Sequence, residues 1–155
     1  MHNRREMLSH SATVAAMLAA AGLLPGLAHA QAAGYDTAAF AAKTMPEVMK
    51  ALGVAAPAES KDVTITGPDI AENGAVVPVG AASALPGVKR LLLLVEKNPS
   101  MLAAMFDVTD AIEANVSTRV KMAQSSDVYA VAMMNDCKVL FARKEMKVTL
   151  GGCGG

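Results

Sequence analysis

The chain has 155 residues, with 14 lysine and arginine side chains balanced by 14 aspartate and glutamate side chains. A balanced charge without a basic stripe gives no support to nucleic-acid binding. Only 3% of the residues are aromatic although 53% are hydrophobic, so any core must be built from alanine, valine, leucine and methionine.

The first 30 residues have the parts of an export signal. Arg4 and Arg5 precede an apolar stretch, residues 12–27, which is followed by the small-residue motif Ala28-His29-Ala30. Paired arginines ahead of such a stretch are typical of the twin-arginine pathway. The alternative is a membrane anchor, but the stretch is interrupted by Pro25 and is shorter than the roughly 20 residues that span a bilayer. We therefore expect residues 1–30 to be a twin-arginine export signal that is cleaved, leaving a periplasmic protein without a membrane segment.

All three histidines, His2, His10 and His29, lie within the predicted signal. The mature chain therefore cannot form a Ser-His-Asp triad, a Cys-His pair or a histidine-containing zinc site. We expect a protein that is not an enzyme and that has no catalytic residue, metal or cofactor of its own.

The mature chain is predicted to begin with a helical segment and a linker, residues 31–60. Thr44 is a capping threonine with Glu47 three residues later, and Gly53 ends the pattern. The apolar side chains between them recur at helical spacing and would pack on a sheet. Residues 55–60, which include a proline, read as the linker.

Residues 61–150 change to a period of two, with turns at intervals of roughly 8–12 residues. About seven short strands of this kind predict an all-β fold, an antiparallel β-sandwich of immunoglobulin-like architecture. The run 88–95 has no polar face, as expected of a strand covered on both sides, and 101–108 is ambiguous between strand and helix. The other extended runs are Val63 with Ile65, Val77 with Val79, 116–122, 128–134 and 139–148, the last two forming a hairpin that reverses at Asn135-Asp136.

The two cysteines, Cys137 and Cys153, would ordinarily suggest a disulfide in an exported protein. We expect none, because Cys137 is predicted to begin a strand and Cys153 lies beyond its far end. At about 3.3 Å per residue the two sulfurs start about 40 Å apart, whereas a disulfide needs Cα atoms within about 7 Å. Cys137 reads as a small residue beside a turn, inert if it is buried.

Cys153 lies in the segment Gly151-Gly152-Cys153-Gly154-Gly155, which has no other side chain. Glycine loses more conformational freedom on ordering than any other residue, so we expect residues 151–155 to be a flexible arm. Fully extended, the arm would carry the thiol up to about 15 Å from the last strand. The alternative is a frayed terminus with an incidental cysteine.

Several motifs together resemble the SoxY family, the sulfur-carrier subunits of the Sox thiosulfate-oxidation system. The terminal G-G-C-G-G is the most specific of them. The others are the paired arginines, Ile70-Ala71-Glu72-Asn73-Gly74 before Val76-Val77-Pro78-Val79, Asn98-Pro99, Ser117-Thr118-Arg119-Val120 and Lys147-Val148-Thr149-Leu150.

The resemblance implies a periplasmic heterodimer with a SoxZ subunit, in which Cys153 covalently holds sulfur intermediates. It also implies transient partners: a haem-containing SoxXA that couples thiosulfate to the thiol, SoxB that hydrolyses off sulfate, and a sulfane dehydrogenase that oxidises the remaining sulfur. The haem would belong to a partner. Cys137 is not part of the motif.

The residues near Cys153 offer little that would activate its thiol. No cationic residue follows Lys147, and a thiol near its ordinary pKa of about 8.5 is only a minor fraction thiolate at neutral pH. Lys144 and Lys147, at the base of the arm, are candidates for holding anionic cargo. The alternative is that both are solvated strand-end lysines.

Two other functions remain open from the sequence. Gly154-Gly155 is also the ending of ubiquitin-like sulfur carriers, which are activated at their C-terminal carboxylate and would tolerate the loss of Cys153. An immunoglobulin-like structural or adhesion module with an anchoring thiol would instead form a fixed intermolecular disulfide and carry no sulfur adducts.

Overall fold

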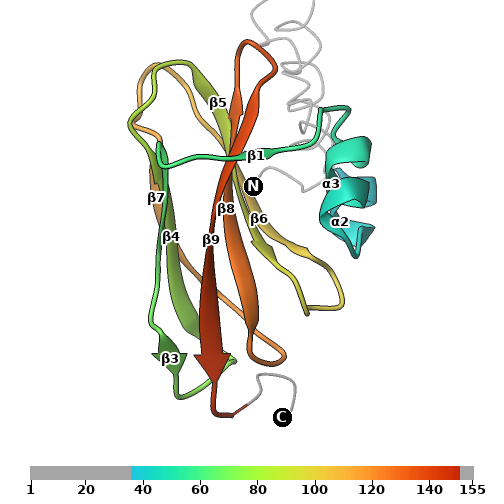
Figure 1. The fold of residues 1–155 in the computed structure, drawn as a ribbon, viewed down its shortest axis with the longest axis vertical. Helices are drawn as coiled ribbons and strands as arrows, with labels where there is room; N and C mark the ends of the chain where they lie inside the picture. Colours follow the sequence, from blue (N-terminus) through green and yellow to red (C-terminus); the bar gives the residue numbers. More distant parts are fainter. Residues whose placement is uncertain (1–35, 151–155) are drawn as a thin grey trace, which may run out of the picture. The chain divides into compact units, whose positions relative to one another are not determined.

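The computed structural model describes residues 36–150, which form two short helices and nine strands (Figure 1). No helix in this part of the chain is long and apolar enough to cross a membrane. The helices are α2 (Thr37–Ala41) and α3 (Met45–Ala51), and the strands are β1 (Ala58–Glu59), β2 (Val63–Thr66), β3 (Ile70–Ala71), β4 (Val77–Ser83), β5 (Val88–Val95), β6 (Leu102–Asp107), β7 (Asn115–Val120), β8 (Ser126–Met134) and β9 (Val139–Val148).

The strands form two sheets. The larger has the order β1-β9-β8-β5-β6, with β3 also pairing to β9, and the smaller has the order β2-β4-β7. The long strands pair antiparallel, as predicted, while the two-residue strands β1 and β3 both lie parallel to β9. The expected β-sandwich with a short helical segment before it is therefore confirmed.

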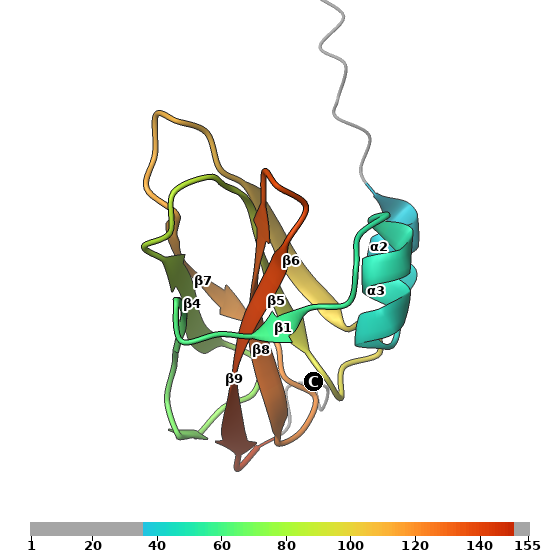
Figure 2. The same cartoon turned by 45° about the horizontal axis from the view of Figure 1, so that its top comes forward.

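Two hydrophobic clusters cover the larger sheet, one on each face. Leu91 and Leu93 belong to the cluster between the two sheets, whereas Leu92 and Leu94 belong to the cluster beneath the helices. All four side chains are 0% exposed. Figures 1 and 2 show the helices on one face of the larger sheet and β4 and β7 beyond the other. The absence of a polar face in β5 thus follows from its burial on both sides, as predicted.

The helical segment is fixed to the sheet at its start and along its apolar side. The predicted capping box is present, with Thr44 as the cap and Glu47 as its partner. The backbone N–H of Lys43 donates to the Glu47 carboxylate at 2.9 Å, and this bond lowers the pKa of that carboxyl group. Val48 and Met49 are buried in the cluster on the larger sheet.

The structure settles one ambiguous run and differs from the sequence-based expectations at β1, at β3, which was not expected as a strand, and at Cys137. The ambiguous run 101–108 contains the strand β6, and the expected linker 55–60 contributes β1, which pairs with β9. The prediction that Cys137 begins a strand is wrong. Cys137 lies in the turn with a left-handed backbone, φ 67°, and β9 begins two residues later.

Candidate functional site

The predicted attachment residue Cys153 and the arm residues Gly151, Gly152, Gly154 and Gly155 lie outside the described residues. The structure describes the segment that directly precedes them in the sequence. This root, residues 147–150, contains the last two residues of β9 and the two that follow, and Leu150 is three positions before Cys153.

At its C-terminal end, β9 is paired with β3 rather than with β8. The β8–β9 pairing ends at Ser126 opposite Met146, and β3 continues on the other side of β9 with Ile70 opposite Lys147. The N–H of Lys147 donates to the carbonyl of Asp69 at 2.9 Å. The last two residues of β9 are therefore held as a strand beyond the end of its antiparallel partner.

A serine side chain replaces β8 on the other edge of the root. The N–H of Val148 donates to Oγ of Ser125 at 2.8 Å, and this hydroxyl lies 3.4 Å from the Val148 carbonyl oxygen. Because Ser125 directly precedes β8, the hydroxyl supplies the partner that the strand no longer offers. The sequence patterns did not single out Ser125.

Residues 67–76, which we call the strap, also bind the root beyond the end of β9. The N–H of Thr149 donates to the Ala71 carbonyl at 3.1 Å, and the N–H of Gly74 donates to the Leu150 carbonyl at 2.8 Å. The Thr149 hydroxyl donates to the carbonyl of Glu72 at 2.9 Å. Both residues after β9 are thus hydrogen-bonded, and the strap holds the backbone as far as Leu150, the last described residue.

The turn within the strap is itself set by its sequence. Oδ1 of Asn73 accepts from the N–H of Ala75 at 2.8 Å, a side-chain turn typical of asparagine. The carbonyl of Gly74 accepts from the N–H of Met122 at 2.7 Å, which ties the strap to the residues after β7. The E-N-G motif noted in the sequence therefore shapes the site rather than only joining two strands.

Lys144 and Lys147 have different environments. The ammonium group of Lys144 donates to the carbonyl of Gly67 at 2.6 Å and lies 2.9 Å from Oδ1 of Asp69. The hydrogen bond from Lys144 lowers the pKa of the Asp69 carboxyl group. Lys144 therefore binds the strap, whereas the side chain of Lys147 is exposed beside the root.

Cys137 lies at the opposite end of β9 and is an exposed free thiol. The N–H of Cys137 donates to the Met134 carbonyl at 3.2 Å, and the side chains on either side of Cys137, Asp136 and Lys138, form an exposed ion pair of 2.8 Å. The ten residues of β9 place it about 30 Å from the root, and the three residues from Leu150 to Cys153 reach at most about 11 Å. This placement is incompatible with a disulfide between Cys137 and Cys153 of one molecule.

Within residues 36–150 no three or more histidine, cysteine, aspartate or glutamate side chains are grouped so that they could hold a metal ion.

The described residues define a class of protein: a β-sandwich whose last strand is held by a strap and leads into a cysteine-bearing segment. The family described as "Sulfur oxidation protein SoxY" matches residues 48–153, so the match includes the strap, the root and Cys153. The chain belongs to the SoxY family.

Comparison with solved structures agrees. The sulfur carrier protein SoxY from Chlorobium limicola f. thiosulfatophilum is 33% identical, with a TM-score of 0.62, over 70% of this chain and 97% of that chain. A superoxide reductase from Ignicoccus hospitalis is 21% identical, with a TM-score of 0.50, over 56% of this chain and 79% of that one, which shows a shared fold alone. A comparison with curated protein sequences finds no match.

Proposed function

We propose that the protein is a periplasmic sulfur carrier that binds thiosulfate-derived sulfur covalently on Cys153 and presents it to partner enzymes. Membership of the SoxY family establishes the broader role in sulfur oxidation. The proposal that Cys153 is the attachment residue rests on one observation, that the family match extends to Cys153. This residue is three positions after Leu150, the end of the root, whose backbone is hydrogen-bonded to the strap.

Loading at Cys153 would be an oxidation. The thiolate and the outer sulfur of thiosulfate form an S–S bond, and two electrons pass to an oxidant, which the family resemblance assigns to the haem of a SoxXA-like partner. Hydrolysis of the product with one water releases sulfate and two protons and leaves a persulfide on Cys153. The carrier supplies the sulfur atom and its tether, and partners supply the electron acceptor and the activated water.

The proposed setting follows from the sequence. The pattern of residues 1–30 supports export by the twin-arginine pathway and cleavage of that signal. The family resemblance supports a stable heterodimer with a SoxZ-like subunit and transient contact with SoxXA-, SoxB- and sulfane-dehydrogenase-like enzymes. We propose that the chain has no catalytic group and no resident cofactor, and that the partners contribute both.

The decisive measurement is the intact mass of the mature protein purified from cells given thiosulfate, before and after reduction. We expect sulfonate and sulfane adducts that a reductant removes. A Cys153→Ser variant should lack these adducts and should not support thiosulfate consumption with the cognate enzymes, whereas the matched Cys137→Ser variant should retain both. Adducts that persist in Cys153→Ser would contradict the proposal.

The same measurements, with a variant that lacks Gly155 added, separate the two alternatives. A ubiquitin-like carrier would keep its activity in Cys153→Ser and lose it when Gly155 is removed. An adhesion module would show a fixed disulfide to another protein and no added sulfur mass.

A further inference from the structure

An open groove separates the edge strands of the two sheets. It has a volume of about 440 Å³ and lies between β6, at the edge of the larger sheet, and β7, at the edge of the smaller one. Residues 98–100, 102–104 and 118–121 line it, and they include two cations, Arg119 and Lys121, but no acidic residue. The lining of the groove is therefore positively charged.

The two cations are free to bind an anion that enters the groove. Arg119 and Lys121 are both exposed, and neither side chain has an ion-pair or hydrogen-bond partner among residues 36–150. They are two positions apart, and their neighbours Val120 and Met122 are buried, so both cationic side chains extend from the same, outer side of the chain. A guanidinium fork beside an ammonium group suits an anion with several acceptor oxygens.

Two hydrogen bonds connect the groove to the root. The N–H of Met122, which directly follows Lys121, donates to the carbonyl of Gly74 at 2.7 Å. The N–H of the same glycine donates to the carbonyl of Leu150 at 2.8 Å. Because only one residue lies between these two bonds, the Met122 nitrogen is within about 9 Å of the Leu150 oxygen. The cations are thus held at a short distance from the last described residue.

The length of chain after the root allows a group on Cys153 to reach these cations. Cys153 is three residues after Leu150, and three residues of fully extended chain span about 11 Å. This reach exceeds the separation of Leu150 from Met122, so an anion attached to the Cys153 sulfur can contact Lys121. The thiosulfonate formed on loading has a negative charge and three acceptor oxygens, whereas an unloaded thiol is mostly uncharged at neutral pH.

We propose that the groove is a docking site for the loaded arm: thiosulfonate on Cys153 binds to Arg119 and Lys121 of the same chain, and unloaded Cys153 does not. This inference rests on the proposed carrier function. Exposed ion pairs are weak, but a short flexible tether gives its bound group an effective concentration in the millimolar range, so weak anion binding is enough to populate the docked state. Docking of this strength keeps the cargo beside the domain and still releases it to an enzyme.

The test uses the mature chain with its SoxZ-like subunit, in a Cys137→Ser background that leaves Cys153 as the only cysteine of the chain. Tetrathionate loads this parent carrier without an enzyme. The Cys153 thiolate attacks one of the two central sulfurs of tetrathionate, the bond between those sulfurs breaks, and thiosulfate leaves. Nuclear magnetic resonance then compares the amide shifts of loaded and unloaded carriers at Ser100 and Thr118, which line the groove and carry no charge.

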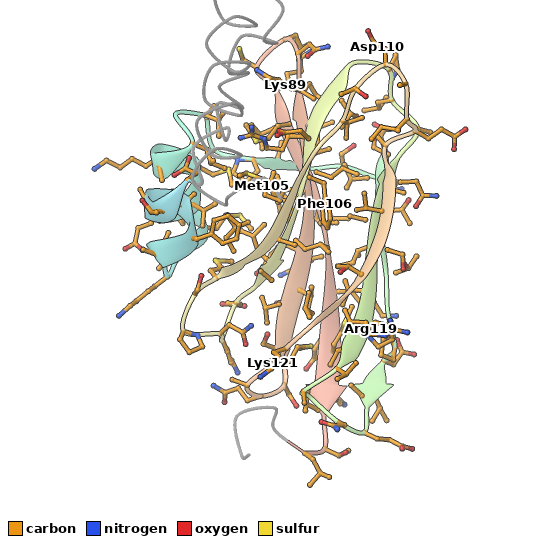
Figure 3. All side chains as sticks on the ribbon, turned by 180° about the vertical axis from the view of Figure 1, so that it is seen from behind. Lys89, Met105, Phe106, Asp110, Arg119 and Lys121 are labelled. Carbon is orange, nitrogen blue, oxygen red and sulfur yellow. The ribbon has the colours of Figure 1, made fainter. Side chains whose placement is uncertain are left out.

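The variant that removes both cations, Arg119→Gln with Lys121→Gln, is compared with Lys89→Gln. Lys89 is a matched control because it is an exposed lysine whose side chain also has no ion-pair partner among the described residues. Figure 3 shows Lys89 and Lys121 toward opposite ends of the domain. Lys147→Gln is a second comparison, because Lys147 is an exposed cation of the root itself.

We expect loading to shift the Ser100 and Thr118 amides of the parent, with about half of the carriers docked at any time. Removal of both cations should weaken docking roughly tenfold, so that these shift changes fall to about one fifth of those in the parent. Lys89→Gln and Lys147→Gln should respond like the parent. Because the site is exposed, about 0.5 M NaCl should also reduce the shift changes of the parent.

A loaded parent without shift changes in the groove, or equal changes with and without the two cations, would overturn the inference and leave the carrier function intact. Loss of the changes in Lys147→Gln alone would also overturn it, by assigning docking to the root. Adducts missing from the protein purified from cells given thiosulfate would instead count against the proposed function.

Two further measurements test the other possible occupants of the groove. Shift changes that grow with carrier concentration would mean that the arm of a second copy binds there. Equal changes on addition of free thiosulfate to Cys153→Ser, at a concentration equal to that of the carrier, would mean that the groove binds anions without the arm. Either result would overturn the inference, whereas we expect changes that are independent of carrier concentration and absent with equimolar thiosulfate.

Discussion

The ammonium group of Lys144 lies 2.9 Å from Oδ1 of Asp69, and this contact joins the strand that leads to Cys153 to the strap that flanks it. The same ammonium group donates to the Gly67 carbonyl, so one side chain holds two points of the strap. Together these two contacts hold Gly67 and Asp69, which lie directly before β3. The pairing of β3 with β9 then extends to the root.

We expect Asp69→Asn to loosen the strap without unfolding the domain. Loss of the charge weakens the contact with Lys144, so the N–H groups of Lys147 and Thr149, which donate to strap carbonyls, should exchange with deuterium faster. Asp136→Asn is the matched control, because it removes an ion pair at the far hairpin turn. Equal exchange at the root in parent and Asp69→Asn would show that the ion pair does not hold the strap.

The same ion pair predicts how the root responds to acid. Bonding to Lys144 lowers the pKa of Asp69 below its ordinary value of 3.8 in the folded state. A carboxyl group with a lowered folded-state pKa stabilises the fold above its unfolded-state pKa, and this stabilisation is lost as the pH falls through the lowered value. Protection of the root amides should therefore decrease below about pH 4.

Nuclear magnetic resonance titration can assign this effect to Lys144. In Lys144→Met the pKa of Asp69 should return toward its ordinary value. The pKa of Asp136, which the hydrogen bond from Lys138 lowers, should stay as it is in the parent. An Asp69 titration that is the same with and without Lys144 would contradict the assigned cause.

Ser125→Ala should destabilise the domain, because it removes the partner of a part-buried backbone donor. The N–H of Val148 would lose its 2.8 Å bond to the hydroxyl, a change that typically costs about 1–2 kcal/mol of unfolding free energy. Denaturant unfolding measures the loss, and Ser117→Ala, at an exposed position on β7, should change stability by less than about 0.5 kcal/mol. Equal stability of the two variants would mean that water replaces the hydroxyl.

Local patterns were enough to predict most of the sandwich. The capping box at Thr44, the turn before Val139 and the apolar run of β5 each depend on residues close in sequence, and each is confirmed. The two-residue strands β1 and β3 escaped prediction because their hydrogen bonds are to β9, about 80 residues away. A pair of residues has no periodicity of its own, so only the tertiary contact makes it a strand.

The candidate site likewise has a part that the local sequence predicts and a part that depends on contacts between distant residues. Cys153 is recognisable because a thiol among glycines is unusual in sequence. The partners of the root and of β9 are not, since Ser125 lies 23 residues from Val148 and Gly67 lies 77 residues from Lys144, the residues with which they bond. Lys144 was a candidate for cargo binding, and its bond to the strap became visible only in the folded chain.

Gly80→Ala should weaken the contact between β2, β4 and β7. A Cβ atom at this position would lie 2.5 Å from Oγ1 of Thr66 and 3.1 Å from the carbonyl oxygen of Val116, so strands on both sides would have to shift. We expect a loss of about 1–3 kcal/mol in unfolding free energy. Adding Thr66→Ala should recover part of the loss, because it removes only the nearer atom, and full tolerance of Gly80→Ala alone would contradict the close approach.

Cys137→Gly should stabilise the domain and leave the carrier function unchanged. Cys137 has φ 67°, a backbone conformation that glycine adopts without the steric penalty of a Cβ atom. We expect a gain of about 0.5–1 kcal/mol from thermal unfolding, and no comparable gain for Cys137→Ala, which keeps its Cβ. Because the Cys137 thiol is exposed, the substitution should also remove one of the thiols that react with a disulfide reagent in the reduced mature chain. Loading of Cys153 from thiosulfate should remain complete, and a fall in loading would show that the turn thiol takes part in the transfer.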